Sequence, residues 1–106
     1  MPKTITKKSE LKALDNTWKK RVKERDNFTC QICKNKLVGR NCHAHHILPK
    51  GMKGCRWDID NGITLCFRCH KVGLYAAHMN AIWFTWWLRK NKYKQFKYII
   101  SKLELR

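Results

Sequence analysis

Hydrophobic residues first recur at helical spacing close to the N-terminal end of the chain. Trp18 and Val22 are four residues apart, so both side chains would lie on one face of a short helix. The pair Asp26-Asn27 favours a turn and should end this helix. The preceding residues, 1–15, are largely basic and polar, and we expect them to form an arm.

Two short extended runs are predicted in the middle of the chain. Residues 42–48 form the first, which Pro49 stops, and residues 63–65 form the second. Asn61-Gly62, a strong turn signal, precedes the second run. Together the runs predict a hairpin-like pair whose long connection is a basic, glycine-containing loop.

The last third of the chain has helical patterns. A helix is predicted from Cys66 toward Met79, and residues 82–88 are apolar on nearly all sides, which favours burial. A last amphipathic helix is expected after a break near Asn91. Its apolar positions recur at helical spacing: Tyr93, Phe96, Ile100 and Leu103.

These elements predict one small mixed domain. A chain of 106 residues has room for a single domain, and its limited core favours an added structural metal site. We expect an α+β fold in which residues 16–106 form the domain after the arm at 1–15. Within it, residues 26–79 would be the core and residues 80–106 a helical extension.

The chain is strongly basic, because it has 24 Lys and Arg but only 7 Asp and Glu, which gives a net charge of +17. No acidic residue lies between Asn61 and Leu103. Such a charge indicates nucleic acid as partner, although a ribosomal-type RNA binder or simple solubility would also account for it. The basic, polar start and the short apolar run at 81–88 predict an intracellular chain with no membrane contact and no small-molecule substrate.

The cysteines indicate a metal. Two CxxC pairs lie 32 residues apart and could together hold one tetrahedral zinc; they are Cys30 with Cys33 and Cys66 with Cys69. A site with four thiolates has no open position for water, so this zinc would be structural. Redox dithiols or free thiols are the alternative. Cys42 and Cys55 have no such partner and are interpreted as spare thiols, although either could replace a ligand.

Histidines and one asparagine form a second pattern inside the cysteine frame. His45 and His46 are adjacent and should point to opposite faces of a strand, so one could meet a metal and the other a phosphate. Asn61 could orient a catalytic histidine, and His70 could be a second metal ligand. Taken singly, each histidine could be a packed or surface residue, and Asn61 could be only a turn residue.

The order CxxC…AHHI…NGITLCxxCH resembles the HNH endonucleases, and the stretch from Trp18 to Cys30 is similar to the run that leads into their first knuckle. The resemblance covers about residues 18–74 and implies a ββα-metal core with a four-cysteine structural zinc and flanking helices. It implies that His46 is the general base, His45 and His70 bind the catalytic divalent ion, and Asn61 orients the base.

One position of this chain departs from the family's pattern. Some members carry a further metal-binding histidine four residues after the last one, where this chain has Leu74. With two protein ligands the ion should keep several waters, as suits Mg²⁺ or Mn²⁺ better than zinc. His43 and His78 match nothing in the motif and are interpreted as surface residues, with DNA contact as the alternative.

We therefore expect a DNA endonuclease that hydrolyses phosphodiesters by a single-metal mechanism. The alternative is a non-catalytic, zinc-ribbon-like nucleic-acid-binding module. Phosphate contacts are expected from basic residues flanking the site, with solvated surface charge as the alternative for each: Lys50, Lys53, Arg56, Arg68 and Lys71. Site choice would be loose or come from a protein partner. The Trp-rich stretch ending at Trp87-Leu88-Arg89 resembles the tails of small phage-encoded members, which would place the chain in a host cytoplasm.

Overall fold

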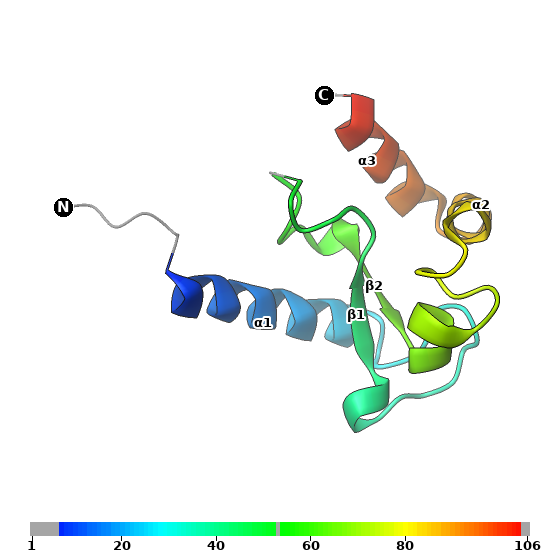
Figure 1. Ribbon diagram of the computed structural model, residues 1–106, viewed down its shortest axis with the longest axis horizontal. Coiled ribbons are helices and arrows are strands. Elements are labelled where there is room, and N and C mark those ends of the chain that lie inside the picture. Colours follow the sequence, from blue (N-terminus) through cyan, green and yellow to red (C-terminus); the bar gives the residue numbers. More distant parts are fainter. Residues whose placement is uncertain (1–6, 53, 105–106) are drawn as a thin grey trace.

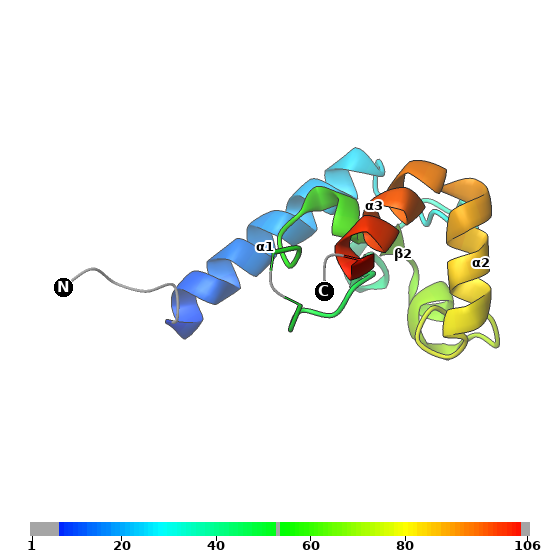
Figure 2. The ribbon, with the colours of Figure 1, turned by 90° about the horizontal axis from the view of Figure 1, so that it is seen from above.

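The computed structural model describes residues 7–52 and 54–104, which form a two-stranded hairpin with helices on either side. In Figure 1, α1 extends to one side of the hairpin and α2 and α3 lie on the other. Figure 2 shows α1 and α2 toward opposite ends of the molecule, with α3 across the middle. The elements are α1 Lys8–Arg25, β1 His43–His46, the 3₁₀ turn η2 Ile59–Asn61, β2 Gly62–Leu65, the π-helical turn η3 Arg68–Val72, α2 Ala81–Asn91 and α3 Tyr93–Glu104. The expected α+β class is confirmed.

Helix α1 is longer than the pattern predicted. It starts at Lys8 and ends at Arg25, so it crosses the boundary that the sequence placed after residue 15. Its buried face carries Asp15, Trp18 and Val22, at the spacing of successive helical turns. Residues 1–6 of the expected arm lie outside the described residues. The division into arm, core and extension therefore remains a proposal.

The end of α1 is tied to the second strand by an arginine–aspartate pair. Arg25 donates to the carbonyl oxygens of Ile59 and Gly62, each at 2.7 Å. Asp26 accepts from Arg25 and from the backbone N–H of Thr64, both at 2.9 Å. The turn residues after the helix thus fix how α1 meets β2.

The hairpin is antiparallel, with His45 opposite Ile63 and His46 opposite Gly62. The predicted turn before the second run is present as η2, which ends at Asn61, but Gly62 has an extended φ of −131° and begins β2. Gly62 is needed for close approach instead, because a Cβ there would lie 2.5 Å from side-chain atoms of both Trp18 and Val22. The missing side chain lets α1 pack directly on the hairpin.

The predicted helix from Cys66 to Met79 is also wrong beyond its first turns. Only η3 is helical there, and Gly73 ends it in an extended conformation with ψ 157°. The chain then folds back: Ala77 N–H donates to the Cys69 carbonyl and His78 N–H to the His70 carbonyl. These long-range backbone bonds replace the helical ones and bring the segment 73–80 over η3.

Helices α2 and α3 cover the other side of the hairpin. The expectation that residues 82–88 are buried is correct for Phe84, Trp87 and Leu88 but wrong for Ile82 and Trp86, which are exposed. In the described structure, other elements cover only one face of α2, so its opposite face stays exposed. None of the described helices has the length and hydropathy needed to span a bilayer.

Helix α3 returns to the hairpin connection. Gln95 donates to the carbonyl oxygens of Asp60 and Gly62, at 3.0 and 2.9 Å, and the Tyr98 hydroxyl donates to Asp58. Ile99 is its buried apolar residue, whereas Tyr93 and Leu103, two of the apolar positions that predicted this helix, are exposed. The predicted break falls at Lys92, between α2 and α3.

Candidate functional site

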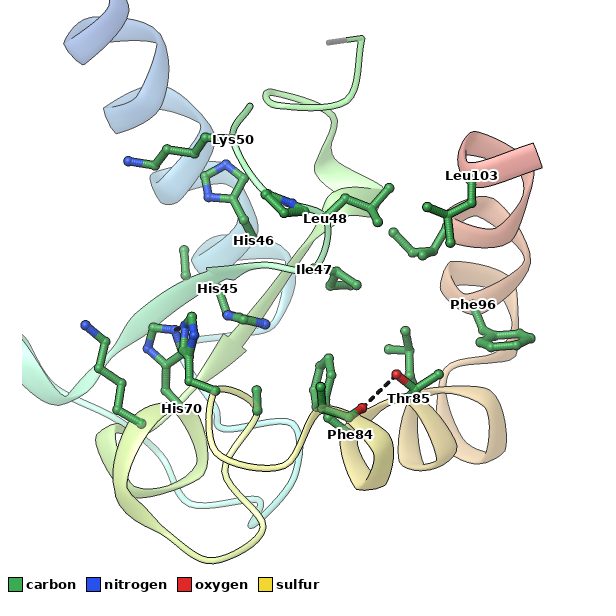
Figure 3. A pocket seen from close by; sticks show the side chains of 18 of the residues that line it. His45, His46, Ile47, Leu48, Lys50, His70, Phe84, Thr85, Phe96 and Leu103 are labelled. Atoms are coloured by element: carbon green, nitrogen blue, oxygen red, sulfur yellow. Dashed lines mark hydrogen bonds between the residues drawn. The ribbon is translucent and has the colours of Figure 1, made fainter. Parts of the chain in front are cut away.

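A cavity of about 760 Å³ opens between β1, η3 and the two C-terminal helices. Figure 3 shows His45, His46 and His70 at one end and the apolar residues Phe96 and Leu103 at the other. None of the described residues that line it is acidic, and Lys50 is among them. The cavity therefore offers neutral nitrogen ligands and positive charge.

The strand separates the adjacent histidines as predicted. His43 and His45 share one face of β1 and both approach the ring of His70, with ring centroids 5.0 and 4.8 Å away. His46 lies on the other face, where its ring stacks on Trp18. The ring centroids are 3.7 Å apart and the ring planes differ by 8°. Figure 3 shows the rings of His45 and His46 on different sides of β1.

Three histidines form a cluster that could hold a metal ion. One nitrogen from each of His45, His70 and His78 lies within 4.8 Å of the other two. The Nε2 atoms of His70 and His78 are 2.9 Å apart. His45 and His70 are buried, whereas His78 is exposed and completes the cluster from the solvent side. His78 is a surface residue, as interpreted from the sequence, and its ring also faces the two buried histidines.

The environment keeps the buried histidines neutral. Burial, followed by the neighbouring His70 and His78, lowers the pKa of His45 to about 3. Burial, followed by His78 and His43, lowers the pKa of His70 to about 4. A neutral imidazole is the form that binds a metal, so the donor set fits a divalent cation.

His46 has a different set of partners. Its Nε2 lies 2.9 Å from the carbonyl oxygen of Arg56 in the hairpin connection. Burial is the largest cause that lowers the pKa of His46 below its usual value, and the bond to that carbonyl opposes it. Its stacking on Trp18 holds the plane of the ring. His46 thus lines the cavity as a neutral, oriented side chain.

Asn61 is fully buried and holds the hairpin connection rather than a histidine ring. Its Oδ1 accepts from the Leu48 N–H at 2.7 Å, and its Nδ2 donates to the carbonyl oxygens of Leu48 and Cys55 at 3.1 and 3.0 Å. Leu48 lies two residues after His46, and Cys55 precedes Arg56. Asn61 therefore holds the backbone at both ends of the loop between His46 and Arg56.

The predicted phosphate contacts lie in different environments. Lys50 and Lys71 are exposed and line the cavity, whereas Arg68 is exposed but lies outside it. The Arg56 guanidinium makes two bonds to Asp15, at 3.0 and 2.8 Å, so it is already paired. Lys53 lies outside the described residues.

Sequence reasoning missed Lys19, which also lines the cavity. Its position next to Trp18 could have indicated it, once the ring of Trp18 was known to stack on His46. Sequence reasoning also missed the hydrogen bond between His43 and His70, although the alternation of β1 places His43 on the same face as His45. His78 offered a weaker signal, because a continuous helix from Cys66 would have placed it away from His70.

The four cysteines of the two CxxC pairs form a second cluster, separate from the cavity. Sγ atoms of Cys33 and Cys66 are 3.8 Å apart, and tetrahedral Zn–S bonds of about 2.3 Å place sulfurs roughly 3.8 Å apart. Burial, followed by the Cys66 and Cys30 sulfurs, raises the pKa of Cys69. A divalent cation would offset that cost, so the cluster could hold a zinc. Cys42 and Cys55 are buried outside it.

The comparison with known protein families matches the part of the chain that carries these residues. Residues 30–72 match the family model of the HNH endonuclease. Over these residues the chain is similar to the HNH endonucleases. The matched range includes both CxxC pairs and every predicted catalytic residue, and ends before His78. HNH domains generally act on nucleic acids as nucleases, with divalent metals.

One curated relative also matches part of the chain. Anaredoxin from Nostoc sp. (strain PCC 7120 / SAG 25.82 / UTEX 2576) is 35% identical over 51 residues, which cover 48% of this chain and 63% of Anaredoxin. The chain thus spans less than two thirds of that relative. No solved structure matches this chain significantly.

Proposed function

We propose that this chain is a metal-dependent DNA endonuclease with His46 as its general base. The hydrogen bond of the His46 ring carries the proposal. A carbonyl oxygen can only accept, so the bond to Arg56 requires the proton of the neutral ring to be on Nε2. Nδ1 then keeps the lone pair, which can accept a proton from water.

The proposed reaction is hydrolysis of a phosphodiester. A water oxygen attacks phosphorus, the P–O bond to the leaving oxygen breaks, and the water proton passes to Nδ1 of His46. A divalent ion held by His45 and His70 would supply Lewis-acid stabilisation of the charge that develops on the phosphate. His46 stays in place because Trp18 stacks on its ring and Arg56 holds Nε2.

Asn61 is a positioning residue in this account. Its three bonds to Leu48 and Cys55 fix the loop that presents the Arg56 carbonyl to His46. Loss of Asn61 would let that carbonyl move, and the proton on His46 could then shift from Nε2 to Nδ1. The role predicted from the sequence is kept, but it acts through the backbone.

DNA would lie across the cavity with its phosphates near the exposed lysines. Lys50 and Lys71, with Lys19, are proposed as phosphate contacts because they line the cavity that holds the histidines. Arg56 is a poorer candidate than predicted, because Asp15 already pairs with it. An intracellular location, a phage origin and a partner that supplies site choice belong to the same proposal.

The four-cysteine cluster is proposed to hold a structural zinc. Each CxxC pair is shaped by its own backbone: the Cys33 N–H donates to the Cys30 sulfur at 3.5 Å and the Cys69 N–H to the Cys66 sulfur at 3.4 Å. With four protein ligands the ion has no open position for water. This zinc would join the turn that carries Cys30 and Cys33 to η3, which carries His70.

Incubation with supercoiled plasmid tests the function. Nicked or linear DNA should appear with Mg²⁺ or Mn²⁺, and excess EDTA added with the metal should prevent it. Binding of duplex DNA, measured by gel shift of the zinc-loaded protein without added Mg²⁺ or Mn²⁺, should persist and weaken steeply with salt. DNA binding without cleavage in any divalent metal would favour the zinc-ribbon-like binding module instead.

A further inference from the structure

His78 lies beyond the residues that match the HNH family, yet its ring completes the histidine cluster. Its place is set by the backbone, because the His78 N–H donates to the His70 carbonyl at 3.0 Å and the preceding Ala77 N–H donates to the Cys69 carbonyl at 2.8 Å. These two bonds hold the segment 73–80 in register with η3. Leu74, where some family members have a histidine, is 78% exposed and outside the cluster.

Hydrogen bonds fix which nitrogen of His70 can bind a cation. The Arg40 carbonyl lies 2.8 Å from His43 Nε2 and can only accept, so His43 carries its proton on Nε2. The lone pair on His43 Nδ1 then accepts from His70 Nδ1 at 2.8 Å. His70 Nδ1 therefore carries the proton, and its Nε2 presents a lone pair to His78.

The facing nitrogens are spaced for one shared ion. Metal–nitrogen bonds of about 2.0–2.1 Å place two neighbouring ligands roughly 3.0–3.4 Å apart. The observed 2.9 Å between His70 Nε2 and His78 Nε2 is close to that range. His45 lies at similar distances from both rings, with centroids 4.8 and 4.9 Å away. The three rings therefore surround one point.

We propose that His78 is a third protein ligand of the catalytic ion and that His43 is the positioning residue that fixes His70 for binding. The proposal rests on the proposed function for placing that ion at His45 and His70. Three imidazoles with no acidic residue among the described cavity-lining residues suit Co²⁺, Ni²⁺ or Zn²⁺ better than Mg²⁺. The ion would thus be held more tightly than the two-ligand motif implies.

Metal titration tests the His78 ligand without using activity. Protein that holds one equivalent of zinc per chain, enough for the cysteine cluster alone, is titrated calorimetrically with Co²⁺ and, separately, with Mg²⁺. Wild type should bind Co²⁺ at least roughly 100-fold more tightly than Mg²⁺. His78→Gln should weaken Co²⁺ binding by about 10-fold or more. Met79→Gln, at the exposed neighbouring position, should leave the affinity unchanged.

Histidine NMR tests the role of His43. In protein that holds zinc at the cysteine cluster and no ion at the histidines, ¹⁵N spectra of the imidazoles should place the His70 proton on Nδ1. His43→Ala should shift that proton toward Nε2 and weaken Co²⁺ binding by roughly 10- to 100-fold, the usual cost of losing such a partner. An unchanged His70 spectrum in His43→Ala would overturn the positioning role.

The outcomes separate this inference from the proposed function. If wild type binds Co²⁺ and cleaves plasmid but His78→Gln binds Co²⁺ equally well, the third ligand is wrong and the nuclease proposal stands. If the titrations follow the expected ranking and plasmid is never cleaved, the metal centre stands and the nuclease proposal is wrong. A wild type that binds no Co²⁺ beyond the zinc overturns the centre itself.

Discussion

The cysteine cluster and the histidine cluster differ in how many ligands they offer and in what surrounds them. Four sulfurs can complete a tetrahedral zinc shell, whereas three histidine nitrogens leave positions for water and substrate. The histidines open onto a cavity lined with lysines, and the cysteines lie apart from it. A complete shell suits folding, and an incomplete one suits chemistry.

The clusters also differ in how the chain builds them. Each cysteine pair is formed by a local turn, in which a backbone N–H donates to the first sulfur of its own pair. The histidines come from β1, η3 and the segment after it, so their meeting depends on tertiary structure. Changes to the first cluster should therefore alter stability, and changes around the second should alter chemistry.

The largest effect is expected from loss of a cysteine ligand. Cys66→Ser should lose the zinc and the cooperative fold, because the binding energy of a structural zinc, roughly 10–16 kcal/mol in peptides, is comparable with the whole stability of a domain. Zinc content by mass spectrometry and thermal unfolding by circular dichroism measure both. Cys42→Ala is the matched control, since Cys42 is buried but outside the cluster. A Cys66→Ser protein that unfolds cooperatively without zinc would contradict the structural role.

This contrast explains what the sequence could predict. The spacing of the cysteines is enough to indicate their cluster, because each pair closes over two intervening residues. The alternation of β1 likewise separates His45 from His46 without knowledge of the rest of the fold. The two strands β1 and β2 were each indicated by a short extended run in the sequence. These features depend on neighbours along the chain.

Other features depend on residues far apart and could not be predicted. Asp15 pairs with Arg56 across 41 positions, which turns an expected phosphate contact into a link between α1 and the loop. Gly73 ends η3 and allows His78 to return to His70, where a continuous helix was expected. Ile82 is exposed because none of the described elements covers that face of α2. Tertiary packing decides each of these cases.

An intermediate effect is expected from Asn61→Ala, which changes the support of the histidine site without removing a histidine. Three buried hydrogen bonds are lost, at about 1 kcal/mol each, so the free energy of unfolding should fall by about 3 kcal/mol. Chemical denaturation measures the loss. Cleavage should fall as well, but less than after removal of the base.

Asn16→Ala, on the exposed face of α1, serves as the control for Asn61→Ala and should change stability by less than about 0.5 kcal/mol. Zinc content should remain unchanged in both variants. If Asn61→Ala were as stable as the control, the loop would not depend on Asn61, and its positioning role would be wrong.

The smallest effect is expected from a lysine at the edge of the cavity. Lys71→Ala should weaken duplex DNA binding a few-fold and reduce the slope of log affinity against log salt by about 0.9, the value for one phosphate contact. Fluorescence anisotropy at several salt concentrations measures both quantities. Lys36→Ala, an exposed lysine outside the cavity, is the comparison. Equal slopes for both variants and wild type would make Lys71 a solvated surface charge.

The rate of plasmid cleavage by His46→Ala tests the central claim most directly. His46 lies on the far face of β1 from His45 and His70, so its removal leaves all three proposed metal ligands and the cysteine cluster in place. The variant should keep its zinc, its Co²⁺ affinity and its DNA affinity while cleavage falls by roughly 10² or more. Cleavage at the wild-type rate by a folded, metal-loaded His46→Ala protein would contradict His46 as the general base.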